Sequence, residues 1–287
     1  MMENNYLHDS RIGRLVEQAL FEDIGFGDIT SESLIPEEQL GKAEFIAKEN
    51  GIISGIDIVK LVFSCVDGQV TFEPSVQDGA LVESGVSLGV VDGPVRSILT
   101  GERVALNFLQ RMSGIATLTH KYVHAVAGTK AKITDTRKTV PGLRMLDKKA
   151  VVDGGGINHR FGLDSMVLIK DNHIVAAGGI TNAVTRCKEY LKSQRSNVKI
   201  EVETTTIDQV KEVLSINGIH RIMLDNYSLK AMSDAVALIN GAIEIEASGG
   251  VNLQTVRAIA ETGVDLISIG ALTHSPKALD ISLEYIS

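Results

Sequence analysis

The second half of the chain alternates short β-branched runs with amphipathic stretches of helical spacing, and this alternation constrains the fold more than any other feature. Six such runs occur in series: AKITD (131–135), SMVLIK (165–170), VKIEVE (198–203), HRIMLD (220–225), AIEIEA (242–247) and VDLISI (264–269). The helical stretches are 143–152, 180–191, 207–216, 229–239 and 253–261. This pattern predicts a parallel sheet with helical crossovers, and an open doubly wound sheet fits it as well as an α/β barrel does.

The residues that close these runs favour the barrel. Each run ends at its carboxyl side in a group with chemical use, and in an α/β barrel those ends converge on one face, where the active site lies. The groups are Thr136, Arg137 and Lys138 after the first run, Lys170, Glu203, Asp225, then Ser248, Gly249 and Gly250, and finally Gly270 and Ala271.

The first half of the chain has a different pattern. Residues 10–22 have helical spacing and the loop DIGFGDIT follows, after which 42–98 reads as a compact sheet-rich domain with Gly-containing turns. A long, mostly apolar helix is expected near 101–127, with Arg103 on its thin polar stripe.

Composition narrows the function. The 287 residues are 44% apolar, enough to bury a large core, and carry a formal net charge of −8, which disfavours a nucleic-acid binder. Cys65 and Cys187 stand apart without metal-ligand spacing and read as reduced thiols. Because the N-terminal residues resemble no signal peptide and no apolar run approaches a membrane span, we expect a cytoplasmic protein.

Basic residues collect at the expected rim despite the acidic overall charge. Arg137 and Lys138 follow the first run, His159 and Arg160 precede the second, and Lys170 ends an apolar strand, so we expect an anionic ligand. Arginine suits planar carboxylates because its fork donates two parallel hydrogen bonds. Lys148 and Lys149 are interpreted as solvated helix charges.

Acidic and glycine-rich turns complete the candidate site. Glu203 and Asp225 are candidates to hold Mg²⁺, directly or through substrate or water, or to stabilise a developing cation, whereas Glu201 is a lesser candidate. Turns that contain glycine after the last two strands of a barrel often bind phosphate through backbone amides. The sequence lacks Walker A, GxSxG and HExxH motifs.

Long segments of the chain resemble the quinolinate phosphoribosyltransferases, also called carboxylating nicotinate-nucleotide pyrophosphorylases. The segments are EDIGFGDIT (22–30), GERVALNFLQRMSGIAT (101–117), DTRKTVPGLRMLDKKAVVDGGGINHRFGLDSMVLIKDNHI (135–174), IEVETT (200–205), IMLDN (222–226) and EASGGVNLQTVRAIAETGVDLISIGALTHS (246–275).

The resemblance implies an N-terminal open α/β sandwich over 1–115 and an incomplete parallel α/β barrel over 116–274, with the tail of about 275–287 as a candidate to pack back on the first domain. It implies Mg²⁺-dependent transfer of phosphoribosyl from phosphoribosyl pyrophosphate to quinolinate, with loss of carbon dioxide. It further implies a homodimer, or a larger assembly, in which each barrel mouth is completed by the partner's first domain.

The resemblance also implies roles for individual residues. Arg103 (from the partner subunit), Arg137, His159 and Arg160 match the quinolinate-binding residues. Lys138 and Lys170 match catalytic lysines near both substrates, Glu203 and Asp225 match the acidic pair near ribose and metal, and Ser248–Gly250 with Gly270–Ala271 match the phosphate loops. Thr136 belongs to the same substrate-binding rim.

Three rival interpretations stay open on the sequence. One is a barrel lyase or aldolase that forms a Schiff base on Lys170. Another is the paralogous group associated with molybdenum transport. The third is a non-enzymatic carrier, suggested faintly by the Gly-rich sheet domain, although that domain has no exposed lysine at an obvious hairpin tip.

Overall fold

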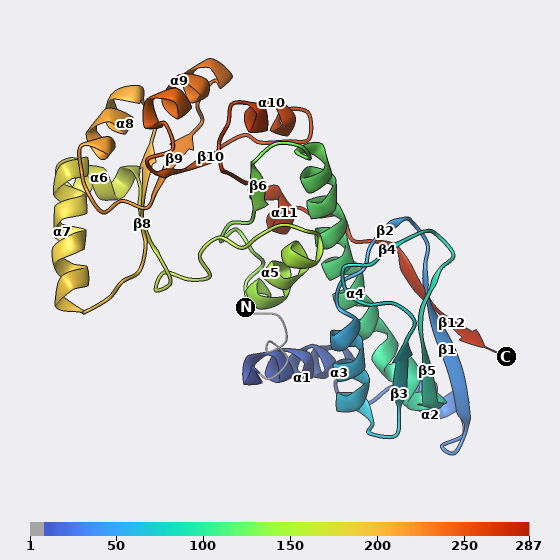
Figure 1. Cartoon of the computed structure of the whole chain (residues 1–287). Coiled ribbons are helices and arrows are strands. Elements are labelled where there is room, and N and C mark those ends of the chain that lie inside the picture. Colours follow the sequence, from blue (N-terminus) through green and yellow to red (C-terminus); the bar gives the residue numbers. More distant parts are fainter. Residues whose placement is uncertain (1–8, 287) are drawn as a thin grey trace. The chain divides into compact units, whose positions relative to one another are not determined.

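The computed structural model describes residues 9–286, which form two compact units (Figure 1). Of these described residues, the first unit contains 9–120, 139–155 and 273–286, and the second contains 121–138 and 156–272. Residues 1–8 of the expected first domain and Ser287 of the expected tail lie outside the described residues. The segment 139–155, which the sequence analysis assigned to the barrel domain, clusters with the first unit.

The first unit is built on an antiparallel sheet of four strands in the order β12–β1–β5–β3. These are β12 (Ile281–Ile286), β1 (Leu40–Ala47), β5 (Ser87–Pro94) and β3 (Thr71–Pro74); β2 (Gly51–Ile52) and β4 (Leu81–Val82) form a separate pair. The C-terminal strand therefore pairs with β1, with Phe45 opposite Leu283. The Phe45 ring packs edge-on against Phe63 and Phe72 at centroid distances of 6.2 and 5.6 Å.

Five helices complete this unit: α1 (Ser10–Ile24), α2 (Ile29–Leu34), α3 (Ile56–Val66), α4 (Val95–Ala125), whose last residues enter the second unit, and α5 (Arg144–Asp153). Helix α4 starts six residues before the expected position. Helix α3 was not foreseen, because its Ile- and Val-rich sequence lay in a region read as sheet. Its first turn is capped from far along the chain, since Asp78 Oδ1 accepts hydrogen bonds from the Gly55 and Ile56 amides at 2.8 and 3.0 Å.

The second unit contains a parallel sheet of six strands, which confirms the α/β prediction. The order is β6–β11–β10–β9–β8–β7, and every pairing is parallel. The strands are β6 (Lys132–Thr134), β7 (Val167–Ile169), β8 (Ile200–Thr204), β9 (Arg221–Asp225), β10 (Glu244–Ser248) and β11 (Leu266–Ser268). Because β6 and β7 stand at the two ends of this order, the sheet is an open, incomplete barrel.

The crossovers of this unit are α6 (Asp171–Ala177), α7 (Ile180–Ser193), α8 (Ile207–Leu214), α9 (Leu229–Ile239) and α10 (Val256–Glu261), and the short helix α11 (Ala271–His274) follows β11 at the boundary of the units. Parallel strands require such connections. Among residues 9–286, no helix combines the length and apolarity that a membrane crossing requires. Cys65 and Cys187 are free thiols.

Candidate active site

The parallel register of the second unit brings the polar strand ends to one edge of its sheet. Glu203 lies in β8, Asp225 ends β9 and pairs with Ser248 at the end of β10. Lys170 directly follows β7, and Thr136 to Lys138 follow β6. Since paired residues point to the same face of a sheet, Asp225 and Ser248 are neighbours on one face.

Two arginines, Arg137 and Arg160, are candidates to bind an anion. Burial lowers the pKa of Arg160, and the positive charge of Arg137 lowers it further. Arg160 donates from one terminal nitrogen to the Met166 carbonyl at 3.0 Å. Arg137 Nε is buried and has no hydrogen-bond partner among the residues that the structure describes. Two like charges with spare donors favour binding of an anion between them.

A lysine and two carboxylates lie along the same edge. Lys170 Nζ is 3.3 Å from Glu203 Oε2, and the Lys170 side chain is half-exposed. This ion pair is unlike the desolvated apolar pocket that activates a Schiff-base lysine, which weighs against the lyase interpretation. On the next strand, Asp225 Oδ2 accepts a hydrogen bond of 2.8 Å from Asn226 Nδ2.

The loop after β10 depends on glycine. Gly249 has φ +95°, and a Cβ at this position would clash with the Asn226 side chain. Gly250 also has a positive φ, of 60°. Helix α10 begins only at Val256, so the backbone of this loop, and not a helix N-terminus, is exposed at Gly250. Gly270 and Ala271 follow β11 at the same sheet edge.

His159 lies one layer deeper in the second unit. Its side chain is 6% exposed, and Nε2 lies 3.1 Å from Glu201 Oε2 and 3.2 Å from Glu246 Oε2, both in fully buried side chains. This nitrogen therefore faces two carboxylate oxygens at almost equal distances. The other ring nitrogen, Nδ1, accepts a hydrogen bond of 2.8 Å from the Arg160 amide. Both ring nitrogens therefore contact protein atoms.

The charges of this buried cluster are coupled. Burial lowers the pKa of His159, but contacts with Glu201 and Glu246 outweigh burial and raise it to about 9. The Arg160 amide opposes a proton on Nδ1, because it needs that nitrogen as an acceptor. Burial and the charge of Glu246 raise the pKa of Glu201 to about 7. We therefore assign one extra proton to the cluster, shared between His159 and Glu201.

Three members of this region were missed from the sequence. Arg221 donates to Glu246 Oε2 at 3.0 Å, and Asp135, fully buried, accepts from the His159 amide at 2.9 Å. Glu246 was missed too, although the alternation of AIEIEA resembles that of VKIEVE, where Glu201 and Glu203 were considered. The sequence did contain a signal for Glu246: a charged residue recurs at every second position of a strand that is buried on both faces.

The remaining expected site residues are more exposed or lie in the other unit. Lys138 is exposed and its amide donates to Thr136 Oγ1 at 3.0 Å. Arg103 belongs to the first unit, where it is exposed on α4. Lys148 is buried and Lys149 is half-buried between Asp78 and Asp153, so the interpretation of these two lysines as solvated charges was wrong.

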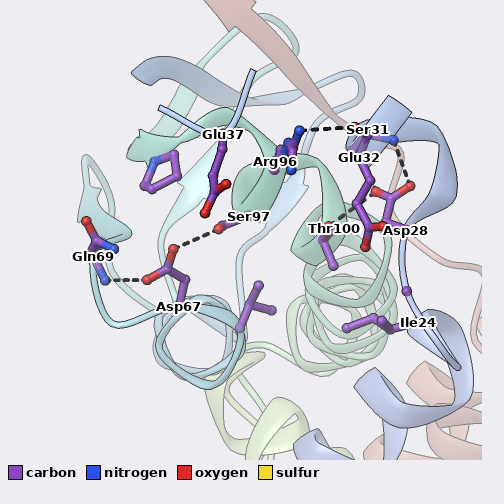
Figure 2. A pocket seen from close by; sticks show the side chains of 13 residues that line it. Ile24, Asp28, Ser31, Glu32, Glu37, Asp67, Gln69, Arg96, Ser97 and Thr100 are labelled. Carbon is purple, nitrogen blue, oxygen red and sulfur yellow. Dashed lines mark hydrogen bonds between the residues drawn. The ribbon is translucent and has the colours of Figure 1, made fainter. Parts of the chain in front are cut away.

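The first unit contains a cavity of about 470 Å³ that is unlike the sheet edge (Figure 2). Asp28, Glu32, Glu37 and Asp67 are among its lining residues. Its single basic side chain, Arg96, donates to the backbone carbonyls of Ile35 and Glu32. An excess of carboxylates repels anions, so this cavity does not suit the ligand expected from the basic rim.

The donor set at the sheet edge fits Mg²⁺ modestly. Glu203 and Asp225 offer carboxylate oxygens on adjacent strands, and Mg²⁺ typically takes one or two carboxylates while it keeps water and substrate oxygens. Among the described residues, the group of three that could enclose an ion is instead His159, Glu201 and Glu246. Arg221 lies 3.0 and 3.8 Å from the two carboxylates of that group, so a cation already neutralises it.

Comparison with known families matches nearly the whole chain. The family model described as quinolinate phosphoribosyl transferase, C-terminal domain, matches residues 115–284, and the model of the N-terminal domain matches residues 28–113. These matches favour the quinolinate phosphoribosyltransferase interpretation over the molybdenum-associated and carrier interpretations.

Individual relatives agree along the full length. The chain is 50% identical over 285 residues to an Arabidopsis thaliana protein named nicotinate-nucleotide pyrophosphorylase (carboxylating), chloroplastic, covering 94% of this chain and 81% of that protein. It is 43% identical to the probable nicotinate-nucleotide pyrophosphorylase (carboxylating) of Bacillus subtilis, covering 96% and 93%. The solved nicotinate-nucleotide pyrophosphorylase of Francisella tularensis superposes with a TM-score of 0.91 at 40% identity, covering 96% of each chain.

Proposed function

Because this chain belongs to the quinolinate phosphoribosyl transferase family, we propose that it transfers the phosphoribosyl group of phosphoribosyl pyrophosphate to quinolinate. The products are nicotinate mononucleotide, pyrophosphate and carbon dioxide, in the biosynthesis of NAD. The relatives are named for this carboxylating or decarboxylating reaction.

The observation that carries the proposal is the buried Arg137 Nε, which has no hydrogen-bond partner among the described residues, together with the partly buried Arg160, whose pKa is lowered by burial and by the charge of Arg137. Quinolinate is a planar dianion with two adjacent carboxylates. Two guanidinium forks at one sheet edge supply paired donors for such a ligand. Lys170, which follows β7 at the carboxyl edge of the same sheet, adds a third positive charge.

The carboxylates of the rim act on the ribose. The quinolinate nitrogen forms a bond to the ribose carbon as the bond from that carbon to pyrophosphate breaks, and positive charge develops on the carbon. Glu203 and Asp225 stabilise that charge electrostatically. The backbone at Gly249–Gly250 and Gly270–Ala271 binds phosphate. Mg²⁺, when bound through Glu203, Asp225 or the substrate, neutralises the charge of the leaving pyrophosphate.

Loss of carbon dioxide follows from the charge of the product ring. Once the nitrogen is alkylated, the ring is a pyridinium. It accepts the electron pair left when the carbon–carbon bond to the adjacent carboxylate breaks, and a proton from water then takes that position. The second carboxylate, held by the arginines, stays on the ring. No organic cofactor is needed.

The direct test is formation of nicotinate mononucleotide from quinolinate and phosphoribosyl pyrophosphate, with nicotinate as the matched substrate. We expect turnover of quinolinate and little of nicotinate, because one carboxylate leaves buried cationic donors unpaired at a cost of about 1–3 kcal/mol or more. Comparable turnover of the two acids would refute the role of the arginines.

Metal dependence forms part of the proposal. EDTA is expected to abolish turnover and Mg²⁺ to restore it, and full activity in chelator would contradict this. Glu203→Ala and Asp225→Ala should lower kcat by roughly 10²–10³, the range seen when a transition-state electrostatic group is lost. Quinolinate affinity, measured by calorimetry, should change far less. The reverse pattern would assign both carboxylates to binding of the acid.

We further propose a homodimer in which Arg103 completes the partner's site. The exposure of Arg103 on α4 makes it accessible to a second subunit. Arg103→Ala and Lys170→Ala proteins should each be inactive, but subunit exchange creates one site in which both residues are intact, so activity should return in the mixture. If exchange is verified and activity stays at the level of the separate variants, the shared site is excluded.

The expected cytoplasmic location belongs to the proposal as well. Cell fractionation with an antibody to the chain tests it, and recovery in an organelle or membrane fraction would contradict it.

A further inference from the structure

The buried cluster beneath the rim has a feature that the proposed reaction does not use. Glu201 and Glu246 both lie within contact distance of His159, and none of the three has more than 6% of its side chain exposed. Isolated buried charges are costly, and partners offset that cost only when the geometry is good. The cluster therefore needs a role beyond simple packing.

We propose that Glu246, Glu201 and Arg221 are positioning residues that hold the His159 ring and, through it, aim Arg160 at the quinolinate carboxylates. This inference rests on the proposed function, because it concerns the acid-binding side of the same site.

The register of three neighbouring strands assembles the cluster. Glu201, Arg221 and Glu244 are aligned across β8, β9 and β10, and Glu246 lies two residues beyond Glu244 on the same face. Arg221 spans this face, donating to Glu244 Oε2 at 2.8 Å and to Glu246 Oε2 at 3.0 Å. Its guanidinium therefore fixes the Glu246 carboxylate.

The cluster lies one step below the rim. Glu203 and Ser248 follow Glu201 and Glu246 by two residues on the same strands, so they point to the same face about 6–7 Å farther along it. The cluster therefore lies below the groups that we assign to ribose and phosphate and is not itself one of them.

The segment that carries Arg160 is tied to the cluster at several points. The Ile157 amide donates to the Ile133 carbonyl at 2.9 Å, and the His159 amide donates to Asp135 Oδ1 at 2.9 Å. The ring of His159 then sits between the two carboxylates, and its Nδ1 receives the Arg160 amide. These contacts fix the backbone at Arg160 and hence the origin of its side chain.

The test compares Glu246→Gln with Glu244→Gln. Both variants remove a carboxylate that contacts Arg221, but only Glu246 contacts His159. In Glu246→Gln we expect the KM for quinolinate to rise about tenfold to a hundredfold, the usual effect of misplacing a binding group by about 1 Å. The KM for phosphoribosyl pyrophosphate should stay within about twofold, and Glu244→Gln should leave both constants within the same margin.

The direction in which the KM for quinolinate changes in Glu246→Gln distinguishes a positioning role from a purely electrostatic or purely structural role. Loss of a negative charge under a basic site strengthens anion binding if the cluster acts only through its field, so a lower KM for quinolinate overturns the proposal. A reduced fraction of active protein with unchanged KM overturns it in favour of a purely structural role. Equal effects in Glu246→Gln and Glu244→Gln overturn it too.

A double-mutant cycle tests whether Glu246 acts through His159. In a His159→Ala background, Glu246→Gln should cause no further rise in the KM for quinolinate, whereas independent effects would multiply. If Glu246→Gln does not fold, Glu201→Gln replaces it in the same cycle. Stoichiometric zinc or iron in the purified protein, lost in Glu246→Gln, would show that the cluster is a metal site and overturn the proposal.

One readout is independent of turnover. Nitrogen NMR of the imidazoles should show His159 with a proton on Nε2 and a hydrogen-bonded Nδ1 in the wild-type protein, and this signature should change in Glu246→Gln but not in Glu244→Gln. If wild-type protein makes no nicotinate mononucleotide, the proposed function fails, and this spectrum still decides whether the cluster anchors His159. If the wild-type His159 ring instead exchanges between tautomers as a free imidazole does, the cluster does not hold the ring and the proposal is refuted.

Discussion

The two units of this chain treat buried charge differently. In the first unit, Arg111 makes a two-pronged contact with the fully buried Asp147, at 3.0 and 2.9 Å, and Lys149 contacts Asp78 and Asp153. In the second unit, groups of like charge influence one another, although Arg221 also contacts the buried carboxylates. The charge of Arg137 lowers the pKa of Arg160, and the charge of Glu246 raises the pKa of Glu201.

The difference indicates which charges serve the fold and which serve the reaction. A carboxylate satisfied by one guanidinium has no capacity left for a ligand, so the Arg111–Asp147 pair is structural. Like charges held near one another cost folding free energy, and such arrangements cluster at functional sites. Replacing individual charged residues of the two units tests this difference.

The largest effect is expected where a buried pair is broken in the first unit. Arg111→Ala leaves the Asp147 carboxylate buried without its partner and should lower the free energy of unfolding by about 3–5 kcal/mol. Urea unfolding measures this. The double variant Arg111→Met, Asp147→Leu should recover much of the loss, since it removes both charges. If the free energy of unfolding of Arg111→Ala stays within about 1 kcal/mol of wild type, the buried pair is not structural and the two units do not differ in this way.

Breaking the arginine pair of the second unit should damage function more than folding. Arg137→Ala removes a donor to a substrate carboxylate, which costs about 2–5 kcal/mol of binding and hence roughly thirtyfold or more in kcat/KM. Its stability should be unchanged or slightly raised, because a repulsion with Arg160 disappears. Lys230→Ala, at an exposed position on α9, is the control. A clear loss of stability in Arg137→Ala would place this residue among the structural charges.

The buried cluster should make stability depend on pH. The folded cluster keeps its extra proton, shared between His159 and Glu201, up to about pH 9, whereas unfolded histidine releases its proton near 6.5. The folded state therefore binds more protons in between, and its stability is greatest below pH 6.5 and is lost as the pH rises through 9. The slope should reach at most about 1.4 kcal/mol per pH unit. Unfolding curves at pH 6.5 to 9.5 test this, with His159→Gln as the variant that should flatten the dependence; equal slopes would refute the assignment.

The smallest effect is expected for surface pairs. Lys211 and Asp208 contact each other at 2.8 Å on α8, but both are well exposed. Lys211→Ala should change the free energy of unfolding by less than about 0.5 kcal/mol, because solvent screens such pairs. A loss above 1 kcal/mol, about the upper limit for exposed pairs, would mean that contact distance and not burial ranks the charges of this protein.

The sequence by itself determined the strands of the parallel sheet and the polar groups at their carboxyl ends. Both are local: a β-branched run has a period of two, an amphipathic helix has a period near 3.6, and the polar groups follow the runs directly. Lys170, Glu203 and Asp225 were identified in this way as polar groups at strand ends, as was the mixed α/β class, whereas the family was identified from the resemblance of long segments.

Only the tertiary structure decided what depends on partners distant in the chain. Helix α3 was missed because an Ile- and Val-rich run fits a strand as well as a buried helix, and its cap comes from Asp78. The interior position of Lys149 arises from Asp78, 71 residues away. Glu246, Arg221 and His159 come together through strand register and a loop contact. The physical reason is that periodicity reports which face of an element is buried, whereas burial of a charge is tolerated only through a partner that tertiary packing supplies.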